Sequence, residues 1–344
     1  MATVGRIPSL DGVRAVAVLL VIAGHLLSGR GGALLLAIFG VHTFFVLSGY
    51  LITRLLQAEW QHNGKIDLVA FYRRRSFRIF PAAFTYILII ALFCPNVRSG
   101  LIYALTYTVS YHFVGTPLYF QHLWSLSVEE QFYLLWPLGL VLAFQHRAKI
   151  AWITMLIAAA FRLTVALGSP GYQSAFVHFS FPGTMDSIAA GCLLAVYEPW
   201  IRERLSWMTD SIAVVTALPL TAWVVEVTCW ADVSETTARS LTVFWGAVPL
   251  LIALWIFILV ERRDRILNNR IASTIGVLSY SLYLWQQPFL VERKFSALVS
   301  ILMLSGCAVA SYGLIERPML RLGAAIQQRR RVPECSHDAL VSSS

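Results

Sequence analysis

Ten stretches of mainly apolar residues recur from the beginning of the chain almost to its end. They lie at residues 13–29, 35–56, 79–94, 127–145, 150–167, 184–198, 211–228, 243–260, 272–290 and 296–315. A helix needs about 20 apolar residues to cross the hydrocarbon core of a bilayer. Of the 344 residues, 58% are hydrophobic and only 13% are charged, and the mean hydropathy is +0.67. The sequence therefore predicts an all-α integral membrane protein with about ten transmembrane helices.

The basic residues indicate which loops face the cytoplasm. With ten crossings, the segments that carry most of the Lys and Arg residues all fall on one side of the membrane, as the positive-inside rule requires. These segments are 54–78, 146–149, 202–204, 261–270 and 317–331. A weaker apolar segment at 101–114 would break the pattern if it crossed. We therefore expect residues 101–126 to form a re-entrant or surface element on the non-cytoplasmic side, and both termini to be cytoplasmic.

This pattern predicts a multi-pass membrane protein, with a membrane domain over 1–322 and a polar, disordered cytoplasmic tail over 323–344. The net charge of +9 does not indicate a nucleic-acid partner, because the basic residues lie in short loops beside apolar segments. The five cysteines show no CxxC spacing, which argues against a thiolate metal site. We expect no metal and no permanently bound cofactor.

The first apolar stretch carries an acid, a guanidinium and an imidazole: Asp11, Arg14 and His25. At about 100° per residue, all three share one face of a helix. Arg14 and His25 lie roughly 16 Å apart along the helix axis. If Arg14 marks one membrane boundary, His25 is near mid-depth, where an ionisable side chain is a candidate for function. Asp11 and Arg14 also fit ordinary roles at a helix end.

The second stretch and the loop predicted after it carry further candidates. Small residues such as Ser48 and Gly49 allow helices to approach closely, so a packing role is favoured for both. The segment FYRRRSFRIFP then places four arginines before the third apolar stretch, and Arg75 and Arg78 would share a face if it is helical. A guanidinium group can bind phosphate oxygens through two parallel hydrogen bonds. On the cluster alone, membrane topology and lipid contact remain the favoured interpretation.

Adjacent carboxylates open the stretch HLWSLSVEEQFYLLWP at residues 122–137. Successive residues of a helix point about 100° apart, so at most one of Glu129 and Glu130 faces a given cavity. An aromatic belt accounts for Tyr133 and its neighbours. A glutamate pair at the start of a membrane helix is costly without a partner, which favours a functional or a paired role.

Ionisable and hydroxyl side chains also occur in the later stretches. Arg162 lies within the stretch at 150–167 and needs a partner at that depth. Asp186 lies near the start of the stretch at 184–198, Tyr283 lies in LSYSLYLWQQPF, and Glu316 lies in IERP. For Arg162 and Glu316 we expect a structural ion pair or a helix cap.

Taken together, these stretches resemble the membrane acyltransferase family 3, the polytopic O-acyltransferases that modify bacterial surface sugars and some secondary metabolites. The resemblance rests on six segments in this order: RIPSLDGVRAVAVLLVIAGH, FFVLSGYLIT, FYRRRSFRIFP, HLWSLSVEEQFYLLWP, LSYSLYLWQQP and IERP. It implies ten spans of the inner (plasma) membrane, acyl-CoA as the donor substrate, with acetyl-CoA expected, and a carbohydrate or lipid-linked glycan as the acceptor. Some relatives carry an extracytoplasmic hydrolase-like domain. This chain is expected to lack one, which allows a separate extracytoplasmic partner.

By position in these segments, the resemblance implies a catalytic role for His25 and Glu130, with His25 as base or acyl carrier. It implies donor binding for Arg14, Arg75 and Arg78. Three departures from the family's usual residues leave the acceptor pocket open: His42, Thr184 and Gln286.

Two rival interpretations remain. A proton-coupled transporter would use a relay of ionisable groups in the membrane: His25, Glu130, Arg162 and Asp186. An inactive family member would act as a binding or scaffold subunit.

Overall fold

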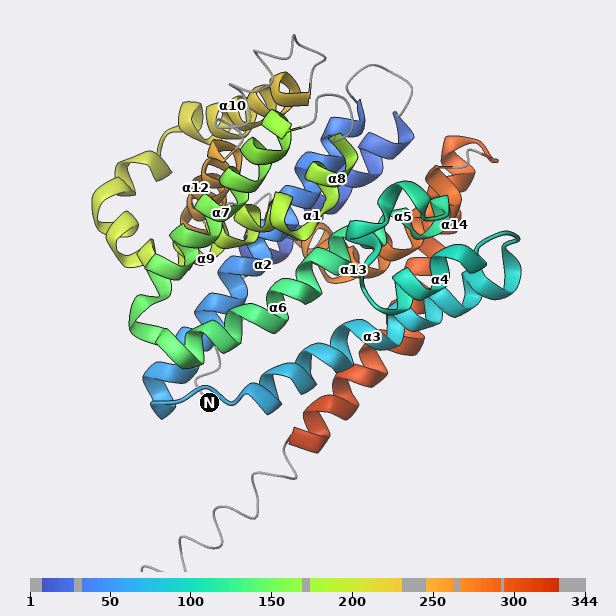
Figure 1. Ribbon diagram of the computed structural model, residues 1–344, viewed down its shortest axis with the longest axis horizontal. Helices are drawn as coiled ribbons and strands as arrows, with labels where there is room; N and C mark the ends of the chain where they lie inside the picture. Colours follow the sequence, from blue (N-terminus) through green and yellow to red (C-terminus); the bar gives the residue numbers. More distant parts are fainter. Residues whose placement is uncertain are drawn as a thin grey trace, which may run out of the picture.

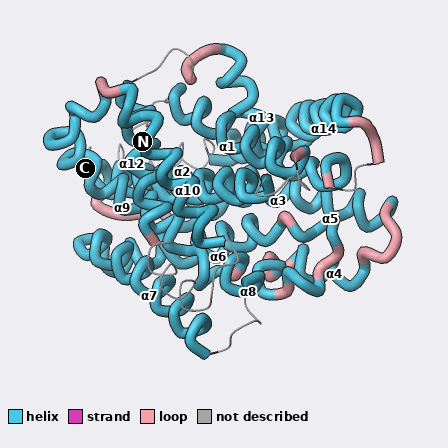
Figure 2. Tube along the Cα trace, turned by 90° about the horizontal axis from the view of Figure 1, so that it is seen from above, coloured by secondary structure: helices cyan, strands magenta, loops and turns pink. Residues whose placement is uncertain are grey.

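The computed structural model describes residues 8–27, 33–168, 174–230, 246–262, 267–291 and 294–327, and these ranges contain helices and connecting segments but no strand. Figure 1 shows α7, α9, α10 and α12 gathered on one side and α3, α4, α5 and α14 on the other, with α1, α2, α6 and α13 between them. Seen from above, the loops that the structure describes are short (Figure 2). The prediction of an all-α protein is confirmed for these ranges.

Each of the ten predicted apolar stretches overlaps a long helix, while residues 28–29 and 243–245 of these stretches lie outside the described residues. The helices are α1 (Pro8–Leu26), α2 (Ala33–Asn63), α3 (Leu68–Phe93), α6 (Leu123–Ala143), α7 (Arg147–Gly168), α9 (Phe181–Leu205), α10 (Ile212–Trp230), α12 (Ala247–Arg262), α13 (Arg270–Leu290) and α14 (Ala297–Ser311). Within the described residues, six helical runs are long and apolar enough to cross a membrane. The protein is therefore a multi-pass membrane protein, while the count of ten and the orientation stay predictions.

The arginine-rich segment is helical, so its prediction as part of a loop is wrong. Helix α3 begins at Leu68, where Asp67 caps it by accepting a hydrogen bond from the Ala70 backbone N–H at 2.9 Å. It continues through Pro81. Four arginines lower the hydropathy of the first turns of α3. A search for apolar stretches therefore does not detect these turns as part of the helix. A helix does place Arg75 and Arg78 on one face, as the spacing predicts.

Residues 98–121 form four short helices: α4 (Arg98–Leu105), η1 (Val109–Tyr111), η2 (Phe113–Gly115) and α5 (Leu118–Gln121). None of the four reaches the length that a bilayer crossing needs. Gln131 of α6 connects this segment to α6 by two hydrogen bonds. Its side-chain amide donates to the Tyr107 carbonyl and accepts a hydrogen bond from the Tyr111 hydroxyl at 2.9 Å. The predicted end of this element at 126 is wrong, because α6 begins at Leu123, and its re-entrant or surface position stays a prediction. The side of the membrane on which it lies stays a prediction.

Helices α2 and α9 cross at a pair of glycines. A Cβ on Gly49 would collide with the Ile188 carbonyl, and one on Gly191 would collide with the Val46 carbonyl. The packing role predicted for Gly49 is therefore confirmed. This crossing holds the middle of α2 against α9, next to Ser48.

The last helix continues α14 through a π-helical turn, η5 (Tyr312–Glu316), and is described as far as Gln327. Gly323 packs against the Phe77 side chain, which brings this C-terminal extension alongside α3, as Figure 1 shows. Residues 323–327 are helical, so the start of the predicted disordered tail is wrong. The contact with α3 supplies packing that the polar sequence does not reveal. Residues 328–344 lie outside the described residues.

α8 (Ser174–Phe179) and two short helices, η3 (Phe144–His146) and η4 (Ser206–Thr209), complete the described elements.

Candidate active site

Two cavities meet at three arginines. The inner cavity, of about 120 Å³, lies among α1, α2, α3, α6 and α13, and the outer cavity, of about 480 Å³, lies between α1, α2, α3 and the C-terminal helix. The side chains of Arg14, Arg75 and Arg78 line both cavities. The arginines therefore stand where a ligand entering from the outer cavity would pass into the inner one.

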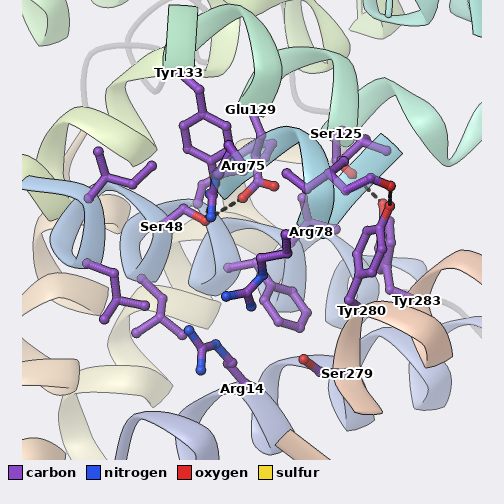
Figure 3. A pocket seen from close by; sticks show the side chains of 18 residues that line it. Arg14, Ser48, Arg75, Arg78, Ser125, Glu129, Tyr133, Ser279, Tyr280 and Tyr283 are labelled. Carbon is purple, nitrogen blue, oxygen red and sulfur yellow. Dashed lines mark hydrogen bonds between the residues drawn. The ribbon is translucent and has the colours of Figure 1, made fainter. Parts of the chain in front are cut away.

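The three guanidinium groups come from two helices and differ in their partners. Arg14 of α1 forms an ion pair with Asp11 at 2.8 Å. Arg75 lies over the ring of Tyr133, 3.8 Å from its centroid. Arg78 is exposed to the cavities. Among the described residues, neither Arg75 nor Arg78 forms an ion pair with a carboxylate. Figure 3 shows Arg14 and Arg78 extending into the same space.

A serine, a glutamate and a tyrosine are joined by hydrogen bonds in the inner cavity (Figure 3). Ser48 Oγ of α2 donates to Glu129 Oε1 of α6 at 2.5 Å, and the Tyr133 hydroxyl donates to Ser48 Oγ at 2.9 Å. Glu129 and Tyr133 are four residues apart, which puts them on one face of α6. The prediction that Ser48 serves packing is incomplete, because its hydroxyl faces the cavity. The belt interpretation of Tyr133 is wrong for its hydroxyl, which is buried and hydrogen-bonded.

The far wall of the inner cavity is formed by Ser125 of α6 and Tyr283 of α13, whose hydroxyl oxygens lie 2.5 Å apart. The Tyr283 hydroxyl also donates to the His122 carbonyl at 2.9 Å. His122 Nε2 lies 3.0 Å from the Leu284 carbonyl, which requires the proton on Nε2. His122 and His25 are close enough to interact electrostatically. His25, the histidine of α1, lines neither cavity.

The model of a family described as an acyltransferase domain matches residues 7–292 of this sequence. That span includes the arginines, the serine and the glutamate of the inner cavity and His25. The chain belongs to acyltransferase family 3. The resemblance inferred from the six segments is therefore confirmed.

Several curated relatives of this family member are O-acetyltransferases by name. The peptidoglycan O-acetyltransferase OatA of Listeria monocytogenes is 30% identical over 316 residues, which cover 83% of this chain and 49% of the relative. The O-acetyltransferase OatA of Staphylococcus aureus is 28% identical over 355 residues, with 92% and 58% covered. The putative peptidoglycan O-acetyltransferase YrhL of Bacillus subtilis is 28% identical over 377 residues, with 98% and 59% covered. The chain thus spans about half to three-fifths of each relative. No solved structure matches.

Many of the side chains that the sequence indicates as candidates line one of the two cavities. Asp11 lines the outer cavity, while Ser48, Glu129 and Tyr283 line the inner one. Of the adjacent glutamates, Glu129 faces the inner cavity and Glu130 lines neither cavity. One of the two facing a cavity agrees with the helical geometry. The catalytic role of Glu130 stays a prediction, and it has no support from contact with either cavity.

The remaining candidates lie elsewhere in the fold. Arg162 and Asp186 form a buried ion pair at 2.7 Å between α7 and α9, which confirms the structural pair expected for Arg162. Glu316 is buried in the π-helical turn and accepts a hydrogen bond from Ser281. None of these residues lines the two cavities, nor does His25. The four residues that a proton relay would use therefore line neither cavity, and the transporter interpretation stays untested.

Sequence reasoning passed over part of this site. It assigned Tyr133 to the interface and gave no role to Ser125, although Ser125, Glu129 and Tyr133 are each four residues apart. That spacing is the signal that could have found them, because it places all three on one helix face. The departures His42 and Gln286 are both buried and line neither cavity. His42 Nδ1 lies 3.3 Å from Ser187 Oγ.

Proposed function

We propose that the protein is an O-acyltransferase of the inner (plasma) membrane that moves an acetyl group from cytoplasmic acyl-CoA to a hydroxyl of a glycan. The observation that carries the proposal is the junction of the two cavities. Arg75 and Arg78 there have no carboxylate partner among the described residues, and a narrow pocket with a buried serine and carboxylate lies directly behind them.

The outer cavity suits the phosphate-bearing end of coenzyme A. Guanidinium forks bind phosphate oxygens through two parallel hydrogen bonds, and cations that form no direct ion pair favour an anionic ligand. A volume of about 480 Å³ lies within the range of small-molecule sites. The inner cavity, of about 120 Å³, suits the acyl end of the same molecule. The donor would therefore lie with its phosphates at the arginines and its thioester beside Ser48.

His25 serves the acceptor half of the proposed reaction. Acyl transfer to a hydroxyl needs a base, and an imidazole can take that proton near neutral pH. His25 lines neither the inner nor the outer cavity, so its assignment to the acceptor half rests on the resemblance to the family. A glycan acceptor is proposed because two of the named relatives are called peptidoglycan O-acetyltransferases, one of them putatively.

The direct test incubates the purified protein with radiolabelled acetyl-CoA and surface glycans, with peptidoglycan fragments among them. The wild type should release coenzyme A and label a glycan. His25→Ala should insert and express normally but transfer no label. Wild-type turnover in that variant, with donor and acceptor both saturating, would remove His25 from the mechanism. An absence of labelled product in the wild type would contradict the proposed activity.

The orientation is tested by two single cysteines in a cysteine-free background, near Gly115 and near Asn269. If α4 to α5 lie outside and the α12–α13 connection lies in the cytoplasm, the two cysteines should react with an impermeant thiol reagent from opposite sides. Labelling from the same side would show that the ten-span topology is wrong.

A further inference from the structure

The hydroxyl of Ser48 has the surroundings of an activated nucleophile. Its proton points at Glu129 Oε1, 2.5 Å away, and its oxygen accepts a second hydrogen bond from the Tyr133 hydroxyl at 2.9 Å. A hydroxyl is a weak nucleophile unless an adjacent base takes its proton, and a carboxylate within hydrogen-bond reach is such a base. Figure 3 shows all three groups facing the inner cavity.

The position of Ser48 is rigid. The next residue, Gly49, packs without a side chain against the Ile188 carbonyl of α9, so α2 has no room to shift there. Glu129 and Tyr133 hold the hydroxyl from α6, and Arg75 lies flat over the Tyr133 ring at 3.8 Å. A group fixed in this way from three helices needs little reorganisation to reach an attacking geometry.

The same cavity supplies a place for the leaving group. Arg75 and Arg78 line it beside Ser48. A thiolate that departs toward the outer cavity would therefore pass two cations that have no ion pair among the described residues. Fixed positive charge where negative charge develops lowers the barrier to such a step.

We propose that Ser48 is an acyl-accepting nucleophile, which carries the acetyl group as an ester between the thioester donor and the acceptor hydroxyl. Glu129 is its base, and Tyr133 is the hydrogen-bond donor to its oxygen. This inference rests on the proposed acyltransferase function and deepens it. It divides the reaction into two half-reactions at one cavity.

In the first half-reaction, Ser48 Oγ attacks the thioester carbonyl carbon and its proton moves to Glu129. The carbon–sulfur bond breaks, and coenzyme A leaves as a thiolate past Arg75 and Arg78. In the second, the acceptor oxygen attacks the ester carbonyl while its proton is relayed through water to His25, which itself lines neither cavity. The bond between the carbonyl carbon and Ser48 Oγ breaks, and Glu129 returns its proton to Ser48. His25 then releases its proton to water and the thiolate takes one up, so no oxidant or reductant is needed.

The test uses the full-length protein in nanodiscs with radiolabelled acetyl-CoA and no acceptor. After denaturation, the wild type should retain label that hydroxylamine removes, and mass spectrometry should place the acetyl group on the peptide that contains Ser48. Ser48→Ala should lose this label, and its multiple-turnover rate should fall roughly 100-fold or more. Ser48→Cys should regain the label as a thioester, which a merely structural serine would not produce. Glu129→Gln should bind the donor but label slowly.

The matched control is Thr43→Ala on the same helix. Thr43 is a buried hydroxyl that donates to the Phe39 carbonyl at 2.9 Å and lines neither cavity, so the variant should label as the wild type does. Label on another residue, or transfer to glycan by the wild type with no acceptor-free label, would overturn the role of Ser48 and leave the acyltransferase function standing. Near-normal turnover of Ser48→Ala would do the same. A wild type that neither binds nor cleaves acetyl-CoA would overturn both.

Discussion

The arginines within the helices of this protein differ in whether they form an ion pair, as a comparison of Arg162 with Arg75 and Arg78 shows. Arg162 is paired with Asp186 at 2.7 Å, it donates to the Gly183 carbonyl at 2.7 Å, and both side chains of the pair are at most 3% exposed. Arg75 and Arg78 line two connected cavities and form no ion pair among the described residues.

This difference separates structural charge from functional charge. A cation taken out of water is costly unless a carboxylate and hydrogen bonds compensate it, and Arg162 has both. Arg75 and Arg78 instead keep access to the cavities, so their charge is available to an anion that enters. The proposed donor site would account for such cations on a membrane helix. The comparison predicts that substitution of Arg162 lowers stability, whereas substitution of Arg75 or Arg78 weakens ligand binding.

The largest expected effect is on stability, at the paired arginine. Arg162→Met leaves Asp186 buried without its cation and should lower the free energy of unfolding by about 3–5 kcal/mol. Thermal unfolding in detergent measures this loss. The double variant Arg162→Met with Asp186→Leu should recover most of it, because no buried charge then lacks a partner. Equal stability of Arg162→Met and the wild type would erase the distinction between Arg162 and the two cavity-lining arginines.

A smaller effect, and one of a different kind, is expected at the cavity. Arg78→Met should unfold at nearly the same temperature as the wild type, since no ion pair in the described structure is lost. It should bind acyl-CoA more weakly by about 1.5–3 kcal/mol, the range for hydrogen bonds to a charged group. Equilibrium binding of labelled acetyl-CoA checks this. A strongly destabilised Arg78→Met that retains donor affinity would reverse the assignment.

The smallest effect concerns the part of the outer cavity that the C-terminal helix lines. Leu320, on the C-terminal helix beyond the matched family domain, lines the outer cavity. Leu320→Trp narrows that cavity and should raise the KM for acyl-CoA about threefold, or about 0.6 kcal/mol, without changing the KM for the acceptor. Leu322→Trp is the control, because Leu322 is exposed on the same helix but lines neither cavity. Equal effects of the two variants would show that this part of the cavity does not contact the donor.

The positions of the long helices follow from hydropathy alone, because a membrane helix must be apolar over most of its length. For the same reason, hydropathy does not predict the first turns of α3, where arginines interrupt the apolar pattern and Asp67 caps the start of the helix. Hydropathy also does not predict that the C-terminal helix continues as far as Gln327, because this part is stabilised by contact with α3. Local sequence reports a helix's composition, while its ends depend on caps and on neighbours.

The site was only partly predictable for a similar reason. The shared face of Arg75 and Arg78 follows from their spacing, and so does the rule that only one of two adjacent glutamates faces a cavity. The identity of that glutamate does not follow, since it depends on how α6 is rotated against α2. Ser48 and Glu129 are 81 positions apart, and their hydrogen bond is set by tertiary packing. A single sequence without aligned relatives contains no sign of that pairing.

The most direct measurement of the central claim is the affinity of acetyl-CoA for the wild type and for the double variant Arg75→Lys with Arg78→Lys. Charge and insertion are preserved in this variant, but an ammonium is a point charge and cannot replace a planar pair of donors. A dissociation constant raised tenfold or more, about 1.4 kcal/mol, is the predicted result, with a smaller change for Arg73→Lys, which lines neither cavity. An unchanged constant in the double variant would show that these arginines serve topology and lipid contact alone, and would contradict a donor site at the junction of the two cavities.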